Sequence, residues 1–341
     1  MGYLHTQVMK RLQLARHPLL IADYRIDGDC LGSSLALADY LKQIGSRPCV
    51  FVSGPIPEKY RFLPLSETCV FDPDILTDST IDLAVALDCS DASYVQSVLR
   101  SVPQRPFLIN IDHHATNPLY GDLNMVDPEA PGVCEIVHQL FTDARILPSP
   151  EVATCLFCGI AFDTTAFFNE MTNHRAFLAA SELIRRGARV RDIIRMLFCH
   201  RSLEALKVWG LALERLRQHP TLGIVSTCLC RRELEEYGVV DDDVDGLSNF
   251  LNMVLGVDTL VVLRETAEGG VKASLRTRTH DVASLARSVG GGGHVRAAGF
   301  SLPRSRLVCP ENGLWRIEAA DKATSLEVSS PCYTEGNSLK S

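Results

Sequence analysis

Four clusters of aspartate and histidine residues could together hold divalent metal ions. They are Asp23-Tyr24-Arg25-Ile26-Asp27-Gly28-Asp29, Asp88-Cys89-Ser90-Asp91, Asp112-His113-His114 and Asp163-Thr164-Thr165. Carboxylate oxygens with one imidazole suit cations such as Mn²⁺ or Mg²⁺, and carboxylates that converge repel one another unless a cation lies between them. Two cations about 3.5–4 Å apart can share a bridging carboxylate and cleave phosphoesters. The clusters therefore predict metal-dependent phosphoester chemistry.

Each cluster alone also has an ordinary structural explanation. An Asp-x-Asp sequence is common in turns and helix caps, a histidine pair is often structural, and an aspartate after an apolar run is often a helix N-cap. What favours a shared site is that the clusters occur in order and that each follows an apolar run.

The elements that must position these residues form an alternating pattern. Apolar runs at 18–22, 49–52, 83–87 and 107–111 predict strands, and helical periodicity predicts helices at 31–44, about 132–142, 150–162 and 174–187. Continuous apolar strands that alternate with helices indicate an α/β fold with a parallel sheet covered on both faces. Binding sites in such sheets lie outside the carboxyl ends of the strands, where the first three clusters are expected.

A smaller second domain is predicted after His219-Pro220. A helical stretch at about 202–217 could connect the two parts, and strand-like runs follow at 222–228, 259–263 and 271–275. We therefore expect a catalytic domain at 1–200, a connecting helix at 201–218, an α/β substrate-binding domain with a mixed sheet at 219–303, and a poorly ordered polar tail at 304–341. A cleft between the domains would hold the substrate.

The second domain carries a candidate anion site. Five basic residues lie between 272 and 299 against one acidic residue, Asp281; they are Lys272, Arg276, Arg278, Arg287 and Arg296. The run Gly290-Gly291-Gly292-Gly293-His294 would let backbone N–H groups approach a phosphate closely. A flexible glycine linker is the alternative, but Ala297-Ala298-Gly299-Phe300 has the composition of a packed segment.

Composition excludes several classes of protein. The chain has 341 residues, 46% of them hydrophobic, which fits two globular domains and not a disordered or fibrous protein. The net charge of −7 disfavours a general nucleic-acid coat, so a nucleic-acid substrate must be short or meet a local basic patch. No apolar run is long enough for a membrane helix, and a cytoplasmic location is expected.

The twelve cysteines are interpreted as reduced thiols. Most lie in apolar runs, as Cys155 and Cys158 do, and no second Cys-x-x-Cys pair completes a zinc site with them. The acidic run Asp241-Asp242-Asp243-Val244-Asp245 is interpreted as a solvated loop or helix start, not as a metal site.

The order of these motifs resembles the DHH phosphoesterase superfamily over roughly residues 10–303. The matching segments are Asp27-Gly28-Asp29-Cys30-Leu31-Gly32-Ser33-Ser34, Asp88, Asp112-His113-His114, Asp163-Thr164 and Gly290-Gly291-Gly292-Gly293-His294-Val295-Arg296-Ala297-Ala298-Gly299. The closing motif is similar to the stand-alone bacterial branch with a DHH-associated domain. That branch holds nano-RNases, phosphatases of pAp (3′-phosphoadenosine 5′-phosphate), and phosphodiesterases of cyclic-di-AMP or pApA.

The resemblance implies two Mn²⁺ ions, with Mg²⁺ as an alternative, and a role for each matching residue. Asp27 would bind one metal, Asp29, His113 and Asp163 would bind the other, and Asp88 would bridge them. His114 would face the scissile phosphate. Ser274, Arg276, Gly292, Gly293 and His294 would hold the rest of the nucleotide.

Two positions depart from the family pattern. The family usually has histidine where this chain has Asp23, and often has glycine in its fourth motif where this chain has Thr164-Thr165-Ala166-Phe167. If Asp23 ligates the first metal, five carboxylates surround the two cations, which should tighten metal binding and raise the pH optimum. The alternative is that Asp23 does not ligate and that the first metal site is weak.

Several functions remain open within this resemblance. Hydrolysis of short RNA or DNA oligonucleotides and of pAp is the first expectation, and cleavage of cyclic-di-AMP or pApA is the second. A nucleotide-binding sensor without catalysis is the alternative from another class, although six retained acidic and histidine residues disfavour it. Polyphosphate is disfavoured because the glycine-rich motif resembles the nucleotide-handling branch. We expect no membrane partner, and a homodimer is left open.

Overall fold

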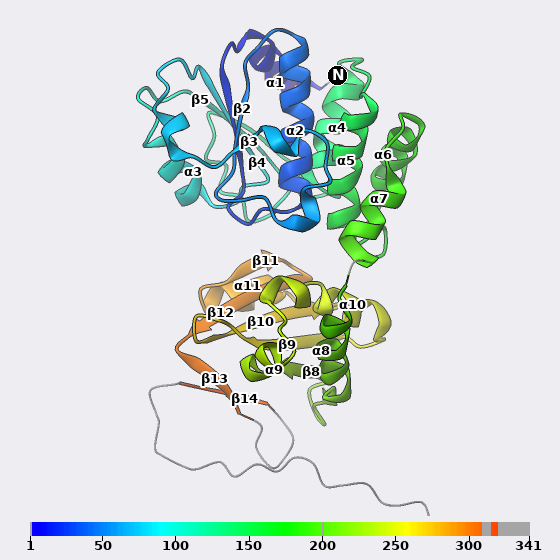
Figure 1. Cartoon of the computed structure of the whole chain (residues 1–341). Coiled ribbons are helices and arrows are strands. Elements are labelled where there is room, and N and C mark those ends of the chain that lie inside the picture. The colour runs from blue at the N-terminus through cyan, green and yellow to red at the C-terminus, as the bar shows by residue number, and fades with distance from the viewer. Residues whose placement is uncertain (1, 200, 309–314, 320–341) are drawn as a thin grey trace, which may run out of the picture.

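The computed structural model describes residues 2–199, 201–308 and 315–319. Within these residues the chain forms two α/β domains, one above the other in Figure 1. No helix in the described part of the chain is long and apolar enough to cross a membrane.

The first domain is built on a sheet of six strands that are all parallel, in the order β3-β2-β1-β4-β5-β6. The strands are β1 (Pro18–Ala22), β2 (Cys49–Phe51), β3 (Cys69–Val70), β4 (Leu83–Leu87), β5 (Phe107–Asp112) and β6 (Leu123–Val126). The four strands that the sequence predicts are confirmed as β1, β2, β4 and β5. The parallel sheet is confirmed as well.

Helices cover both faces of this sheet, as the continuous apolar strands predict. Alternate residues of β1 enter two separate cores: Leu20 and Ala22 pack among α1 (Tyr3–Leu14), α2 (Gly28–Gln43), α4 (Val133–Asp143), α5 (Pro150–Asp163) and α6 (His174–Arg185). Leu19 and Ile21 pack on the other side with α3 (Ala92–Leu99). Short 3₁₀ helices lie at Glu58–Tyr60, Ser66–Thr68 and Pro73–Thr77.

Helix α2, the first after β1, is held in place by an N-terminal cap and by close packing on α5. Asp27 is the N-cap of α2, and its carboxylate accepts hydrogen bonds from the backbone N–H groups of Asp29 and Cys30, both at 3.0 Å. Along its length α2 packs on α5 so closely that a Cβ at Gly32 would collide with the carbonyl oxygen of Cys155. The cap and this close packing hold Asp27 and Asp29 at the carboxyl end of β1.

The second domain contains a mixed sheet of six strands, in the order β11-β12-β10-β9-β8-β7. They are β7 (Arg217–Gln218), β8 (Ile224–Leu229), β9 (Thr259–Glu265), β10 (Gly270–Thr277), β11 (Gly292–His294) and β12 (Ala297–Pro303). Only the β8–β9 pair is parallel. The mixed sheet and the packed character of residues 297–300, which lie in β12 between β11 and β10, are confirmed.

The helices of this domain lie on two faces of its sheet. One face carries α8 (Leu203–Glu214), α9 (Arg231–Glu236) and α10 (Leu247–Val254), whose apolar residues pack with Leu260 and Val262 of β9. The other face carries α11 (Val282–Ser288), which packs on Leu275 of β10. The predicted helix at 202–217 is shorter than expected, since residues 217–218 form β7. Its side chains belong to the core of the second domain.

Between the domains lie α7 (Val190–Ile194) and one turn of π-helix at Arg195–Cys199. The acidic run at 241–245 starts with a 3₁₀ helix at Asp241–Val244, followed by α10. This outcome agrees with the predicted helix start.

The expectation of a poorly ordered tail from residue 304 is wrong for the residues that the structure describes beyond it. Strands β13 (Ser305–Val308) and β14 (Arg316–Ala319) pair as an antiparallel hairpin. Leu307, Trp315 and Ile317 pack against the buried Val271 and Ala273 of β10, so the hairpin closes a gap in the core. Residues 309–314 and 320–341 lie outside the described part.

Candidate active site

The predicted acidic residues gather at the carboxyl ends of β1, β4 and β5 and at the end of α5. Asp29 and Asp88 come close to His113, with one ligand atom from each within 4.8 Å of the others. Nε2 of His113 lies 3.6 Å from Oδ1 of Asp88 and 3.3 Å from Oδ2 of Asp163. Four segments that are far apart in the sequence therefore meet at one point, as the sequence predicts.

In the ring of His113, at the centre of this group, Nε2 is the atom that can accept a hydrogen bond or bind a cation. Nδ1 of His113 lies 3.2 Å from the carbonyl oxygen of Ala130, and since a carbonyl only accepts, Nδ1 carries the proton. Burial, followed by the neighbouring His114, lowers the pKa of His113 and favours the neutral ring. Its Nε2 lone pair then faces the oxygens of Asp88 and Asp163, a repulsive arrangement that a cation between them would relieve.

Three carboxylate oxygens at the site are buried and have no hydrogen-bond partner within the described part of the chain. They are Oδ2 of Asp23, Oδ1 of Asp88 and Oδ2 of Asp163. Burial, together with mutual repulsion, raises the pKa of Asp88 and of Asp163 well above the usual range and raises that of Asp27 to about 6. Asp163 also lies at the C-terminal end of α5, where the helix dipole disfavours a negative charge. These residues fit divalent cations, which would satisfy the unpaired oxygens and their charge.

Two glycines that the sequence analysis did not single out make room for Asp29. Both oxygens of Asp29 accept hydrogen bonds from the start of α4, from Val133 N–H at 2.5 Å and from Cys134 N–H at 2.8 Å. A Cβ at Gly159 would lie 2.5 Å from Oδ1 of Asp29, and one at Gly132 would lie 3.0 Å from it. A glycine inside the apolar helix 150–163 was the available signal, because glycine weakens a helix unless a close contact requires it.

Asp23 is buried in the same group but has a cationic neighbour. Its Oδ1 accepts a hydrogen bond from the backbone N–H of Arg25 at 2.8 Å and lies 3.6 Å from Nε of the same residue. Burial raises the pKa of Asp23, and Arg25 opposes that change. The guanidinium therefore offsets part of the additional negative charge that Asp23 brings to the site.

His114 is held by a network of polar side chains. Its Nδ1 donates to Oδ1 of Asp112 at 2.8 Å, and Oδ2 of Asp112 accepts from Asn117 Nδ2 at 2.5 Å. Asn117 in turn bonds to Asn110, which bonds to Asn124. Burial alone opposes a charge on Asp112, but the hydrogen bonds from His114 and Asn117 outweigh it and lower the pKa of Asp112. Asp112 and this network orient the ring of His114.

The second domain contributes a third histidine to this group. The ring of His294 stacks on that of His114 with 4.6 Å between centroids and lies 5.2 Å from that of His113. Burial, followed by the two neighbouring histidines, lowers the pKa of His294 to about 3 and keeps it neutral. A second link joins the domains at the same place, where Nε of Arg296 lies 3.5 Å from Glu170.

The glycine-rich segment brings His294 to this position by packing closely on β12. A Cβ at Gly291 would collide with the carbonyl oxygen of Gly299, and one at Gly293, whose φ is +132°, would lie 2.5 Å from that of Ala297. Gly292 faces open space. Glycine is therefore required by close approach at two of these positions.

Arg276 on β10 is a partly buried cation without an acidic partner in the described residues. Its guanidinium donates to Oδ1 of Asn249 at 2.9 Å and to the carbonyl of Leu275 at 2.9 Å. Burial lowers its pKa to about 10. Ser274 lies two residues away on the same face of β10 and lines a separate pocket below α10.

Metal clusters of other kinds are not formed by the described residues. Cys155 and Cys158 are buried free thiols, as predicted, and Asp241 and Asp245 pair with Arg264. Asn117, Gly132 and Gly159 are residues of the site that the sequence analysis did not single out, and Asp112 is one to which it gave no separate role.

Comparison with known proteins agrees with this geometry. Residues 19–160 match the model of the DHH family, N-terminal domain, and residues 224–313 match the DHHA1 domain. The chain is 33% identical over 298 residues to the bifunctional oligoribonuclease and PAP phosphatase NrnA of Thermus thermophilus, covering 86% of this chain and 87% of that protein. The chain belongs to the DHH family. This membership makes it a hydrolase that acts on phosphoester bonds.

Two further proteins are similar to this chain, one in sequence and one in fold. The protein of the same name from Bacillus subtilis is 24% identical over 300 residues, covering 87% of this chain and 93% of that protein. The crystal structure of an exopolyphosphatase-related protein from Bacteroides fragilis superposes with a TM-score of 0.78 at 23% identity, covering 87% of this chain and 90% of that one.

The asparagine network gives a test of how His114 is held in this DHH protein. Replacing Asn117 with Ala removes the hydrogen bond to Asp112, and we expect kcat to fall about 10–100-fold, as for other residues that orient a catalytic ligand, with little change in KM. Asn124→Ala is the matched control, because Asn124 belongs to the same network but does not contact Asp112. Steady-state kinetics and thermal unfolding of both variants check this, and equal kcat values for the two would contradict it.

Proposed function

We propose that this DHH protein is a Mn²⁺-dependent phosphoesterase that degrades short oligoribonucleotides as an exonuclease and dephosphorylates pAp. The observation that carries the proposal is the meeting of His294, from the second domain, with His113 and His114 beside Asp88. A substrate that is cleaved there must also contact the glycine-rich segment and Arg276. Only a small molecule with a second phosphate or a short chain end satisfies both demands.

The residues that would hold two cations are Asp23, Asp27, Asp29, Asp88, His113 and Asp163. Asp88 would be a ligand in this set, since its Oδ1 has no hydrogen-bond partner among the described residues and lies 3.6 Å from Nε2 of His113. When bound, such cations polarise the phosphoryl oxygens and lower the pKa of a coordinated water. Mn²⁺, with Mg²⁺ as the alternative, fits a set of carboxylates with one imidazole.

The remaining side chains would bind and orient the phosphate. His114 donates from Nδ1 to Asp112, and although burial opposes a charge on the ring, Asp112 outweighs it and raises the pKa of His114. The protonated ring would donate from Nε2 to a phosphoryl oxygen of the scissile group, where charge develops in the transition state. Arg276 and the backbone of Gly292 and Gly293 would hold the other phosphate of pAp or of a nucleotide end. His294, kept neutral by burial, would accept or donate one hydrogen bond at the same place.

Two observations support oligoribonucleotides and pAp over the alternatives. The relatives from Thermus thermophilus and Bacillus subtilis are both named for these activities. The net charge of −7 also disfavours a long polymer, because binding one depends on many basic contacts. Cleavage of cyclic-di-AMP or pApA is the second candidate. A cytoplasmic location and a homodimer stay predictions.

Relative hydrolysis rates test the choice of substrate. The panel is a dinucleotide, a five-residue oligoribonucleotide, pAp, cyclic-di-AMP and pApA, each with saturating Mn²⁺ and then with Mg²⁺. We expect the dinucleotide and pAp to be turned over fastest. A fastest rate with cyclic-di-AMP would replace the proposal with the second candidate. Tight nucleotide binding without turnover of any member would indicate a sensor.

A further inference from the structure

The pocket below the start of α10 lies on the face of the second sheet that also carries Arg276. It is lined by Lys272 and Ser274 of β10, by Arg264 of β9 and by residues 245–248, among others. Side chains alternate between the two faces of a strand, so Lys272, Ser274 and Arg276 project to the same side. Asn249, which bonds to Arg276, belongs to the same α10 that covers this pocket.

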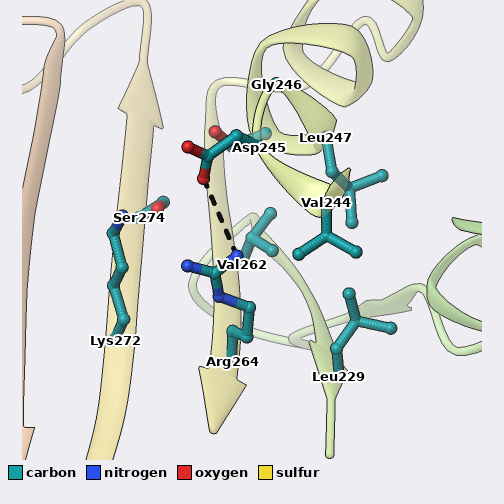
Figure 2. A pocket seen from close by; sticks show the side chains of 10 residues that line it. Leu229, Val244, Asp245, Gly246, Leu247, Val262, Arg264, Lys272 and Ser274 are labelled. Carbon is teal, nitrogen blue, oxygen red and sulfur yellow. Dashed lines mark ion pairs between the residues drawn. The ribbon is translucent and has the colours of Figure 1, made fainter. Parts of the chain in front are cut away.

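The pocket has two basic side chains, Arg264 and Lys272, and Lys272 has no acidic partner among the described residues. Arg264 is engaged, because Nη1 lies 3.7 Å from Asp245 and Nη2 lies 3.7 Å from Asp241. Figure 2 shows the pair of Arg264 and Asp245 on one side, while the Lys272 side chain runs along β10 toward Ser274 on the other. An ammonium and a hydroxyl side by side, with no carboxylate paired to the ammonium, form a group that suits a phosphate oxygen.

The spacing along β10 relates this pair to Arg276. Alternate residues of a strand are about 6.6–6.8 Å apart, which is comparable to the separation of neighbouring phosphates in an extended nucleic-acid strand. Along β10, Ser274 and then Lys272 follow from Arg276 in the direction away from His114 and His294. A chain whose first held phosphate lies at Arg276 would bring its next phosphate to Ser274 and Lys272.

We propose that Lys272 and Ser274 form a subsite for an additional backbone phosphate, used by a trinucleotide or longer chain but not by pAp. This inference rests on the proposed function and adds to it a residue that selects for chain length. pAp has only two phosphates, one for the site of cleavage and one for Arg276, so it leaves the subsite empty. Lys272 would therefore affect the affinity for longer substrates alone.

Equilibrium binding tests the subsite without depending on turnover. The protein is titrated with Mn²⁺ present against a fluorescently labelled phosphorothioate trinucleotide and, in competition, against pAp. Lys272→Gln should weaken trinucleotide binding about tenfold, since a hydrogen bond to a charged group is worth about 1.5–3 kcal/mol, and should leave pAp binding unchanged. Lys272→Arg should retain most of the affinity.

The matched control is Lys207→Gln, because Lys207 is another exposed lysine of the same domain, on α8. The salt dependence gives a second readout. The slope of log Kd against log salt for the trinucleotide should fall by about 0.7 in Lys272→Gln, as for one lost phosphate contact in a single strand, and should not change in Lys207→Gln. An equal effect of Lys272→Gln on pAp and trinucleotide, or no effect on either, would overturn the subsite.

These outcomes are distinct from failure of the proposed function. If the wild-type protein hydrolyses none of the substrates but Lys272→Gln still weakens only the trinucleotide, the subsite stands and the catalytic proposal falls. If hydrolysis is confirmed but Lys272 has no effect on binding, the catalytic proposal stands and the subsite falls.

Discussion

Replacing Asp88 with Asn should reduce kcat by about 10³-fold or more, which corresponds to a loss of about 4 kcal/mol of transition-state stabilisation. Asp88 is buried between His113 and His114, and its Oδ1 has no hydrogen-bond partner among the residues that the structure describes. Asn keeps the shape but removes the charge that both cations would share. Its backbone φ of +63° is also tolerated by Asn, so the turn after β4 should be retained.

This variant should not be less stable in the absence of metal. Burial and the neighbouring carboxylates raise the pKa of Asp88, so its charge opposes folding at neutral pH, and Asn removes that opposition. The control is Asp91→Asn, an exposed aspartate in the same segment that caps α3 and makes the same change of charge. Turnover of pAp and thermal unfolding after chelation check both effects. A kcat near the wild-type value for Asp88→Asn would show that Asp88 is not part of the active site.

Replacing Arg276 with Met should raise KM for pAp by about 100-fold or more while leaving the protein at least as stable. The expected loss corresponds to about 3 kcal/mol, the upper end for a hydrogen bond to a charged group. Burial lowers the pKa of Arg276 to about 10 and none of the described carboxylates pairs with it, so the charge costs free energy in the folded protein. Met fills a similar space without that cost.

The combination of the two effects makes this test informative. A purely structural arginine would lower the unfolding temperature when replaced and would change KM only through misfolding. Arg278→Met is the control, since Arg278 follows β10 and is exposed. Steady-state kinetics with pAp and calorimetric unfolding of the metal-free variants give both readouts. A lower unfolding temperature with an unchanged KM would show that Arg276 stabilises the fold and does not bind the substrate.

The fully buried parts of the fold are predictable from the sequence because burial leaves a continuous apolar run. Strands β1 and β4 lie in the middle of the sheet and carry such runs, and their predicted bounds agree with the structure. Strand β6 lies at the edge and contains Asn124, and β3 has only two residues, so neither has a recognisable pattern. The β13–β14 hairpin is polar on one face, so its sequence predicts a polar tail and not a pair of strands.

The sequence predicts which residues belong to the candidate site, but it does not predict their positions relative to one another. The aspartates and histidines stand out because they follow buried segments. The position of His294 on the ring of His114 depends on how two domains dock, which no local pattern reports. The roles of Asp112 and Asn117 depend on tertiary hydrogen bonds, and the pairing of Arg25 with Asp23 depends on a turn. The negative charge of the five carboxylates counted from the sequence is therefore partly offset by Arg25.

The most direct test of a metal-dependent site is the rate of AMP release from pAp by protein that has been freed of metal and then supplied with Mn²⁺. No measurable release is expected with chelator in excess, because the buried carboxylates and His113 alone provide no activated nucleophile. Added Mn²⁺ should restore turnover, and the restored activity should saturate. Release that continues at the same rate in chelator would contradict a metal-dependent phosphoesterase site at Asp88 and His113.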